Sequence, residues 1–410
     1  MSLRLLQLLI VHKVLSHKAL APNKEHCKMI VISLDGFGAT DLDIPGLKIP
    51  NIRGLEKDGL SAEYLKPVFS TLTFPNHWSM VTGAYEDQHG ILDNFMWDPV
   101  LKKSFSMREP GDEFFQEAET IFGTANRSGI RTFTLNWPAS DREVQGYYPT
   151  YWSPYDESVP YKERIDRLIQ AMEEDDEIRL GMTYFEEPDK SAHFKGGPKS
   201  QDVKNAIEEL DGLMGYLRKE LHRIKGDVNL VVLSDHGLVP ASLKDKGIYI
   251  PDYLTMPGST SLIERISAFG AVTHIWPKDP ARDSDLILKN LSDAKHMTCS
   301  KKEDLRDSWH YKSHRRVSPV VCVSDSEWMT YDNKERLKRH IVGWHGYDNE
   351  DIGMRAIFFA AGPQIARAGK PVKAFEMVHI YALMAHVIGI PEKQWPKNSA
   401  SVNAVIPSDE

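Results

Sequence analysis

Short apolar runs that end in acidic residues constrain the fold of this chain more than any other feature. The first run, residues 29–34, is rich in β-branched side chains and stops at Asp35-Gly36. The same form recurs at residues 131–135, 180–185, 230–233 and 356–361. Runs of this kind are typical of buried parallel strands.

Helical patterns separate these runs, most clearly in residues 202–224, where apolar side chains recur at helical spacing. Strands that alternate with helices predict an α/β fold with a mostly parallel central sheet. Residues 238–341 alternate less clearly and contain more turns and polar side chains. We therefore expect residues 238–341 to form a smaller lobe inserted into the main domain.

The composition excludes several classes of protein. The 410 residues carry 50 basic and 58 acidic side chains, a formal net charge of −8, so no nucleic-acid coating surface is expected. The cysteines Cys27, Cys299 and Cys322 are too few for a disulfide framework or a cysteine-rich zinc module. Pairing of Cys299 with Cys322 is one alternative. After the N-terminus no apolar run is long enough for a membrane span.

Residues 1–27 have features of a secretory leader. Arg4 precedes the apolar residues 5–11, and residues 19–21 resemble a cleavage site. Histidine and lysine side chains interrupt the apolar region, so an amphipathic N-terminal extension is the alternative. Glycosylation triplets at Asn126 and Asn290 agree with export. The prediction is a secreted glycoprotein, or one in the lumen of the secretory pathway.

Residues 68–94 contain a candidate nucleophile, Thr73. Residues 77–82 favour a helix that stops at Gly83, and Pro75 suits the first helical turn. Thr73 is therefore expected at a helix N-terminus, where unpaired N–H groups and the helix dipole favour a phosphate-sized anion. An ordinary capping threonine is the alternative.

Acidic residues follow three of the predicted strands. Asp35 follows the first, Asp189 follows residues 180–185, and Asp235 follows residues 230–233. The carboxyl ends of parallel strands meet at one edge of a sheet, where ligands bind. Carboxylates that converge there repel one another, and divalent cations usually relieve this repulsion.

Three histidines add nitrogen ligands to these carboxylates. His193 lies four residues after Asp189, on the same side of a helical turn, while His236 follows Asp235 directly and His345 lies between turn residues. Carboxylate and imidazole ligands without thiolate suit catalytic zinc. Taken singly, each residue also suits a surface hydrogen bond, a cap or a turn. Together they are enough for two ions.

Seven motifs along the chain form a specific pattern. They are LDGFG at 34–38, TFPNH at 73–77, TGAYEDQHGILDN at 82–94, NWPASD at 136–141, EEPDKSAH at 186–193, SDHG at 234–237 and HGYDN at 345–349. From about Met29 onward the chain resembles the nucleotide pyrophosphatase/phosphodiesterase family within the alkaline phosphatase superfamily. The resemblance implies an alkaline phosphatase-like three-layer fold, with residues 28–410 as the phosphodiesterase catalytic domain.

The resemblance also implies a role for each motif residue. Thr73 would be the nucleophile and Asn94 the oxyanion partner. One zinc ion would use Asp189, His193 and His345, and the other Asp35, Thr73, Asp235 and His236. The implied reaction is hydrolysis of a phosphodiester or pyrophosphate bond through a phosphoryl-threonine intermediate, with a nucleoside 5′-monophosphate as product. An inactive binding homologue is the non-enzymatic alternative.

The small-molecule substrate is less constrained. The resemblance implies that it contacts Phe74, Asn94, Trp137, Asp141, Tyr155 and Tyr184. Aromatic rings stack on a base with little regard to its identity. Core packing is the alternative for Phe74 and Trp137. A cage for a quaternary ammonium group, formed by Trp152, Tyr155, Asp156 and Glu157, would instead favour choline or lipid-type phosphodiesters.

Two positions depart from the family pattern. Lysines commonly stand just before the nucleophile and just after the oxyanion asparagine, where this chain has Leu72 and Phe95. Without these lysines we expect a preference for apolar or neutral leaving groups over polyphosphate. The alternative is that another cation, such as Lys102 or Lys103, reaches the same space.

Overall fold

A seven-stranded sheet forms the centre of the computed structural model, which describes residues 27–254, 262–365, 371–397 and 402–405. The strand order is β2-β18-β9-β1-β8-β6-β7. These strands are β1 (Lys28–Leu34), β2 (Leu60–Ser61), β6 (Arg131–Leu135), β7 (Tyr151–Ser153), β8 (Ile178–Phe185), β9 (Val228–Leu233) and β18 (Phe358–Ala361). The five from β9 to β7 are parallel.

The predicted strands are therefore confirmed, but the parallel direction expected for residues 356–361 is wrong. In β18 Phe358 lies beside Leu233, the last residue of β9, and Ala361 lies beside Leu230. The chain reaches β18 from the loop that carries His345, which lies at the carboxyl edge of the sheet. A strand that starts at this edge has to run antiparallel to its neighbour.

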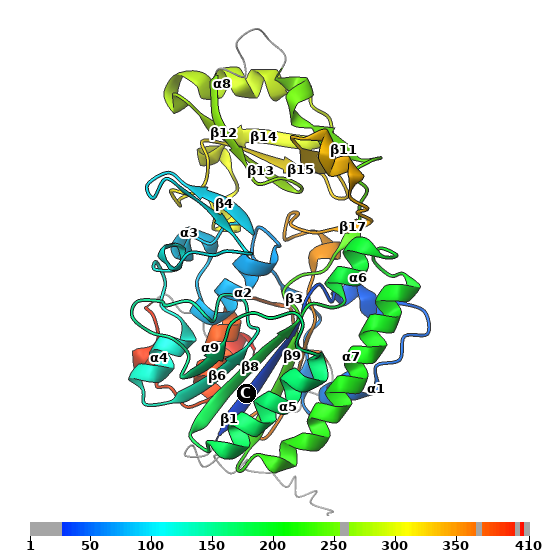
Figure 1. The fold of residues 1–410 in the computed structure, drawn as a ribbon, viewed down its shortest axis with the longest axis vertical. Coiled ribbons are helices and arrows are strands. Elements are labelled where there is room, and N and C mark those ends of the chain that lie inside the picture. The colour runs from blue at the N-terminus through cyan, green and yellow to red at the C-terminus, as the bar shows by residue number, and fades with distance from the viewer. Residues whose placement is uncertain (1–26, 255–261, 366–370, 398–401, 406–410) are drawn as a thin grey trace, which may run out of the picture.

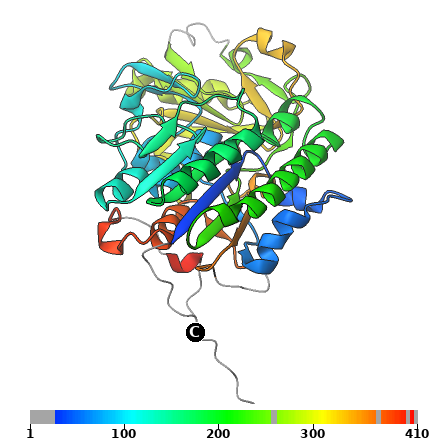
Figure 2. The same ribbon diagram turned by 60° about the horizontal axis from the view of Figure 1, so that its bottom comes forward.

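Helices cover both faces of the sheet (Figures 1 and 2). They are α1 (Pro50–Asp58), α2 (Thr73–Thr82), α3 (Glu86–His89), α4 (Ile121–Arg127), α5 (Tyr161–Glu174), α6 (Asp189–Phe194), α7 (Gln201–Glu220) and α9 (His379–Val387). The side chains of β1 alternate between two cores. Met29 and Val31 pack with α2, α4 and α9, and Ile30 and Ile32 pack with α1, α5 and α7. This is the three-layer arrangement expected from the sequence.

The helix predicted at residues 202–224 is α7, and it ends four residues earlier than expected, at Glu220. Ser200 caps its N-terminus by accepting a hydrogen bond from the backbone N–H of Val203. A short 3₁₀ turn, residues 221–223, continues the helical path. The apolar stripe of the sequence is the buried face of α7, packed on the sheet.

A second sheet lies in the region predicted to form the smaller lobe (Figure 1, top). It consists of β12 (Ile263–Ser267), β13 (Val272–Pro277), β15 (Val320–Ser324) and β14 (Met297–Lys301), all antiparallel, covered by α8 (Pro280–Leu291). A separate apolar core includes Ile275, Ile287 and Val320. A disulfide joins Cys299 to Cys322 across β14 and β15.

The described residues also form four two-stranded ribbons. They pair β3 (Leu65–Lys66) with β19 (Phe375–Glu376), β4 (Phe95–Asp98) with β5 (Lys103–Ser106), β10 (Val239–Pro240) with β17 (Gly343–Trp344), and β11 (Gly247–Tyr249) with β16 (Met329–Tyr331). No helix among the described residues is long and apolar enough to cross a membrane. The predicted leader lies outside the described residues except for its last position. Asn126 is exposed and Asn290 is half-buried.

The segment between β14 and β15 fastens the lobe to the main domain. The ring of Trp309 stacks on that of Phe69 with centroids 4.0 Å apart. The fully buried Arg316 donates from Nε to the Asp98 carboxylate at 2.6 Å and from Nη1 to the carbonyl oxygens of Gly90 at 2.6 Å and Phe114 at 3.0 Å. The lobe therefore shares part of its core with the main domain.

We predict that Arg316→Met lowers the free energy of unfolding by about 3–5 kcal/mol, because it leaves buried acceptors without their donor. Urea unfolding followed by circular dichroism measures this loss. Arg315→Met is the matched control, since the adjacent Arg315 also pairs with Asp98 but its side chain is 37% exposed. Its expected cost is below about 1 kcal/mol. Equal losses for the two variants would contradict the assignment.

Candidate metal centre and active site

Three carboxylates meet at the carboxyl ends of the adjacent strands β9, β1 and β8. Asp35 follows β1, Asp235 follows β9, and Asp189 begins α6 after β8. The backbone holds them together, because the N–H of Asp189 donates to the carbonyl of Asp35 at 3.0 Å and the N–H of Gly36 donates to Asp235 at 3.1 Å. Gly36 has a φ of +69°, and a Cβ there would lie 2.9 Å from that of Asp189. Only glycine fits this turn.

One oxygen of each carboxylate, Oδ1 of Asp35, Oδ1 of Asp189 and Oδ2 of Asp235, is buried without a hydrogen-bond partner. Burial and the nearby Asp235 carboxylate raise the pKa of Asp35 well above its usual range. Burial raises the pKa of Asp235 to about 8. Buried acceptors without donors are costly, and a divalent cation is the partner that such oxygens fit.

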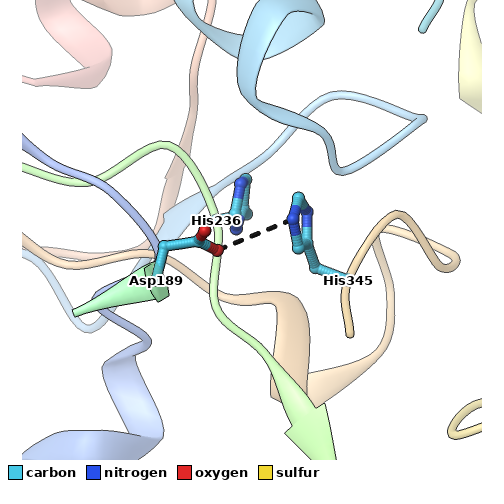
Figure 3. A group of neighbouring side chains, drawn as sticks. All are labelled: Asp189, His236 and His345. Carbon is cyan, nitrogen blue, oxygen red and sulfur yellow. Dashed lines mark ion pairs between the residues drawn. The ribbon is translucent and has the colours of Figure 1, made fainter. Parts of the chain in front are cut away.

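Three histidines bring their Nε2 atoms close to these carboxylates. Figure 3 shows two of them, His236 and His345, beside Asp189. Their Nδ1 atoms lie 2.7, 3.1 and 2.9 Å from backbone carbonyl oxygens, in the order His193, His236 and His345. A carbonyl oxygen can only accept, so each Nδ1 carries the proton and each neutral ring presents a lone pair at Nε2. Hydrogen bonds of this kind commonly orient metal-binding histidines.

Burial lowers the pKa of His236 well below its usual value and that of His345 to about 4. Both rings are therefore neutral at pH 7, as metal ligation requires. For His193, burial lowers the pKa, but the Asp189 carboxylate outweighs burial and raises it.

The distances between neighbouring candidate ligands fit tetrahedral zinc. Nε2 of His193 lies 3.2 Å from Asp189 Oδ1, and Nε2 of His236 lies 3.2 Å from Asp235 Oδ2 and 3.4 Å from Asp35 Oδ1. Two ligands bound at about 2.0–2.1 Å with a tetrahedral angle stand about 3.3 Å apart. Without a cation these lone pairs and carboxylate oxygens would face one another.

The ligand atoms form two overlapping groups within 4.8 Å, one of Asp189, His236 and His345 and one of Asp35, Asp235 and His236. His193 joins the first group through Asp189. The structure thus brings the six predicted ligands to one place. His236 lies between the groups, its ring stacked on that of His345 with centroids 3.6 Å apart. The division of the ligands between two ions stays a prediction.

Thr73 is the first residue of α2, and Leu72 rather than Thr73 occupies the capping position. The helix ends at Gly83, as predicted. Oγ1 of Thr73 lies 3.4 Å from His236 Nε2, so the hydroxyl faces the carboxylate and imidazole cluster. Asn94 accepts the N–H of Phe74 with its side-chain oxygen at 2.9 Å. This leaves the Asn94 amide NH₂ to donate to a ligand.

His77 fixes the first turn of α2, a role that the sequence did not reveal. Its Nδ1 donates to the carbonyl of Thr73 at 2.8 Å, and its Nε2 lies 2.8 Å from the hydroxyl of Ser33 on β1. Burial lowers the pKa of His77 to about 3, so the ring is neutral. The sign of this role in the sequence is that His77 lies four residues after Thr73, one helical turn away.

Two of the predicted substrate contacts, Trp137 and Tyr184, are nearly buried, and their contact with substrate stays a prediction. Trp137 is only 2% exposed and belongs to the core beside α2, since the sheet and α2 enclose it. Tyr184 is 6% exposed, and its hydroxyl donates to Asp35, so it supports a candidate ligand. Phe74 is half-buried at the start of α2, and Asp141 pairs with Arg142 at 2.7 Å.

Tyr155 is 49% exposed and donates its hydroxyl hydrogen bond to Glu186 at 2.8 Å. Two of the residues considered for an ammonium cage make other contacts. Trp152 stacks on Tyr148 with centroids 5.3 Å apart, and Glu157 pairs with Lys190 at 2.8 Å. These contacts use groups that a quaternary ammonium ligand would need.

The fold and the site define an α/β enzyme with a candidate metal centre at the carboxyl edge of its sheet. The chain belongs to the type I phosphodiesterase / nucleotide pyrophosphatase family, whose model matches residues 29–348. The prediction of a phosphodiesterase-type hydrolase with an alkaline phosphatase-like fold is therefore confirmed at the level of the family.

Three relatives support this membership. Human ectonucleotide pyrophosphatase/phosphodiesterase family member 5 is 33% identical, over 91% of this chain and 76% of its own. The bis(5′-adenosyl)-triphosphatase of Xenopus laevis is 32% identical, over 90% of this chain and 79% of its own. The solved murine ectonucleotide pyrophosphatase/phosphodiesterase 5 has a TM-score of 0.83 and 34% identity, over 91% of this chain and 97% of that chain. An inactive threonine-to-alanine variant of that murine protein was solved in complex with AMP.

We predict that Asp235 lowers the stability of metal-free protein as the pH rises from about 4 to 8. Asp235 keeps its proton up to a pH of about 8 in the folded state, whereas an unfolded aspartic acid releases it near pH 3.9, at about its usual pKa. At this group the folded state therefore binds more protons in this window, and its contribution to the unfolding free energy falls. Asp235→Asn removes this penalty, so its Tm should depend less on pH. Thermal unfolding in chelator measures both slopes, and equal slopes would contradict the prediction.

Proposed function

We propose that this chain is a two-zinc phosphodiesterase and nucleotide pyrophosphatase that releases nucleoside 5′-monophosphates through a phosphoryl-threonine intermediate. The observation that carries the proposal is the Thr73 hydroxyl, 3.4 Å from His236 in a cluster of carboxylates with unpaired oxygens. Family membership supports the reaction class.

The donor set supports zinc, because it combines imidazole nitrogen with carboxylate oxygen. One ion would be held by Asp189, His193 and His345, and the other by Asp35, Thr73, Asp235 and His236. When bound, the zinc ions offset the negative charge of the phosphate group and lower the pKa of the threonine hydroxyl.

In the proposed reaction, Thr73 Oγ1 attacks phosphorus in line with the departing oxygen. The Oγ1–P bond forms as the bond from phosphorus to the leaving alcohol or phosphate breaks. The Asn94 amide donates to a non-bridging oxygen, where charge accumulates, and the N-terminus of α2 favours the anion. Water then displaces the threonine oxygen, which releases the monoester and restores the hydroxyl.

A nucleotide is the substrate class that the surroundings favour. Phe74 directly follows Thr73 and is half-buried, and Tyr155 is exposed and donates to Glu186. Such rings stack on any base. The names of the relatives agree, since one is a bis(5′-adenosyl)-triphosphatase and another was solved with AMP. The ammonium cage of the choline alternative lacks comparable support.

The same proposal includes an extracellular or luminal location. The Cys299–Cys322 disulfide fits an oxidising compartment, and the exposed Asn126 is accessible to glycosylation. The partner is a small-molecule nucleotide or phosphodiester.

We predict that zinc-loaded protein hydrolyses the nitrophenyl ester of a nucleoside 5′-monophosphate much faster than the nitrophenyl ester of phosphocholine. Chelator should remove the activity. Thr73→Ala should lower kcat by at least about 10³-fold because the attacking oxygen is lost, and it should leave the zinc content unchanged. Thr73→Ser should keep part of the activity, because the oxygen remains. Release of nitrophenol followed by absorbance is the measurement. Substantial turnover by Thr73→Ala with zinc still bound would remove Thr73 from the mechanism.

A second prediction concerns the division of the ligands. His345→Ala should bind about one zinc ion fewer per chain, because one three-residue site loses a ligand. Mass spectrometry of metals in the purified protein gives the ratio. His340→Ala is the control, since His340 is exposed five residues before His345 and should leave the zinc content unchanged. Unchanged zinc in His345→Ala would refute the assignment.

A further inference from the structure

Arg265 on β12 carries a positive charge that the described residues do not compensate. Its guanidinium carbon lies 3.9 Å from the ring centroid of Trp97 on β4. Its Nε is buried without a hydrogen-bond partner, and no carboxylate among the described residues lies within ion-pair distance. An arginine held on an indole face with free N–H groups is ready to bind an anion.

Other stacked arginines of the same region are neutralised. Arg306 lies over Trp309 and pairs with Asp348, and Arg316 lies over Phe114 and pairs with Asp98. A cation–π contact is therefore usually combined here with a carboxylate partner. Arg265 lacks that partner, which points to an external anion.

Trp97, on which Arg265 lies, belongs to β4, which begins directly after Asn94. Side chains alternate along a strand, so Phe95 and Trp97 lie on the same face of β4. Phe95 is 47% exposed. At about 3.3 Å per residue, Trp97 lies about 10 Å along the strand from Asn94.

Arg265 itself belongs to the lobe hairpin of β12 and β13. A Cβ added at Gly346, next to His345, would lie 2.9 Å from Leu72 and 3.4 Å from Ala271 in the turn of this hairpin. Ala271 of the turn and Leu72, the residue before Thr73, therefore both lie beside Gly346. From this turn β12 leads to Arg265, where it contacts β4 (Figure 1). β4 starts beside Asn94 and β12 ends at this turn, and the two strands contact each other where Arg265 lies over Trp97.

We propose that Arg265 binds the phosphate groups of an anionic leaving group, such as the pyrophosphate of a nucleoside triphosphate. The proposal rests on the proposed function and names a specificity residue for it. A phosphate chain that extends from the bond under attack, past Leu72 and Phe95, meets the guanidinium of Arg265. Guanidinium binds phosphate oxygens through two parallel hydrogen bonds, and the indole face holds it in place.

Leu72 and Phe95 by themselves predict a preference for apolar or neutral leaving groups. The proposed role of Arg265 replaces that prediction. The positive charge on the leaving-group side comes from the inserted lobe instead of from the neighbours of the catalytic motifs. Lys103, considered as a substitute, pairs with Glu113 at 2.7 Å. Lys102 is exposed in the turn between β4 and β5. Neither lysine shares the position of Arg265 between the two strands.

The test compares kcat/KM for a nucleoside triphosphate and for the nitrophenyl ester of the same nucleotide, at fixed ionic strength. Arg265→Met keeps an apolar stem on Trp97 but removes the charge. It should lower kcat/KM for the triphosphate about tenfold or more, as expected for a lost charged hydrogen bond, and leave that for the ester within about twofold. Arg265→Lys should retain part of the kcat/KM for the triphosphate, because the positive charge remains. Equal losses on both substrates, or no loss on either, would overturn the proposal.

A control variant and a binding measurement distinguish failure of the role of Arg265 from failure of the proposed function. Arg306→Met is the matched control, because Arg306 is also stacked on a tryptophan but is paired with Asp348, and both substrates should be unaffected. In the Thr73→Ala background, calorimetry should show that Arg265→Met weakens triphosphate binding about tenfold without changing monophosphate binding. Equal triphosphate Kd values would refute the role of Arg265 even if turnover is absent. A wild-type protein that hydrolyses neither substrate would refute the proposed function instead.

Discussion

The repulsion among Asp35, Asp189 and Asp235 is the constraint on which the rest of the structure depends. Three adjacent parallel strands deliver these carboxylates to one edge of the sheet, and burial leaves one oxygen of each without a donor. Such a cluster is stable only when bound protons or a counter-charge reduce the repulsion. The buried cores on both faces of the sheet keep the three carboxylates together. The stability of the fold therefore offsets the unfavourable free energy of the cluster.

The hydrogen bonds behind the cluster decide what it can bind. Backbone carbonyls hold the Nδ1 protons of His193, His236 and His345, so all three rings present lone pairs to the same space as the carboxylates. In metal-free protein, the raised pKa of Asp235 favours a proton on that carboxyl. A bound cation would take the place of this proton, and the Thr73 hydroxyl lies within reach of the same ligands.

Much of this arrangement could be predicted from local sequence. Strand runs that end in Asp35 or Asp235, the four-residue spacing of Asp189 and His193, and the helix that starts at Thr73 each express a local rule. Local sequence could not predict the direction of β18, because that direction depends on where the preceding loop enters the sheet. The burial of Trp137, inside the motif at 136–141, and of Tyr184, just before the motif at 186–193, was equally hidden. Motif membership fixes the position along the chain but not the side of the element that faces the ligand.

The inserted lobe shows a second limit of motif-based prediction. The chemistry of the candidate site comes from the sheet and α2, whereas the surface opposite β4 comes from β12, far along the chain from Asn94. Leu72 and Phe95, read as neighbours of the motifs, indicate an apolar leaving-group side. Arg265 changes this picture because packing of the lobe, fastened through Trp309 and Arg316, places its guanidinium over Trp97. Substitutions in the lobe can therefore alter the charge on the leaving-group side while the residues that perform the chemistry stay the same.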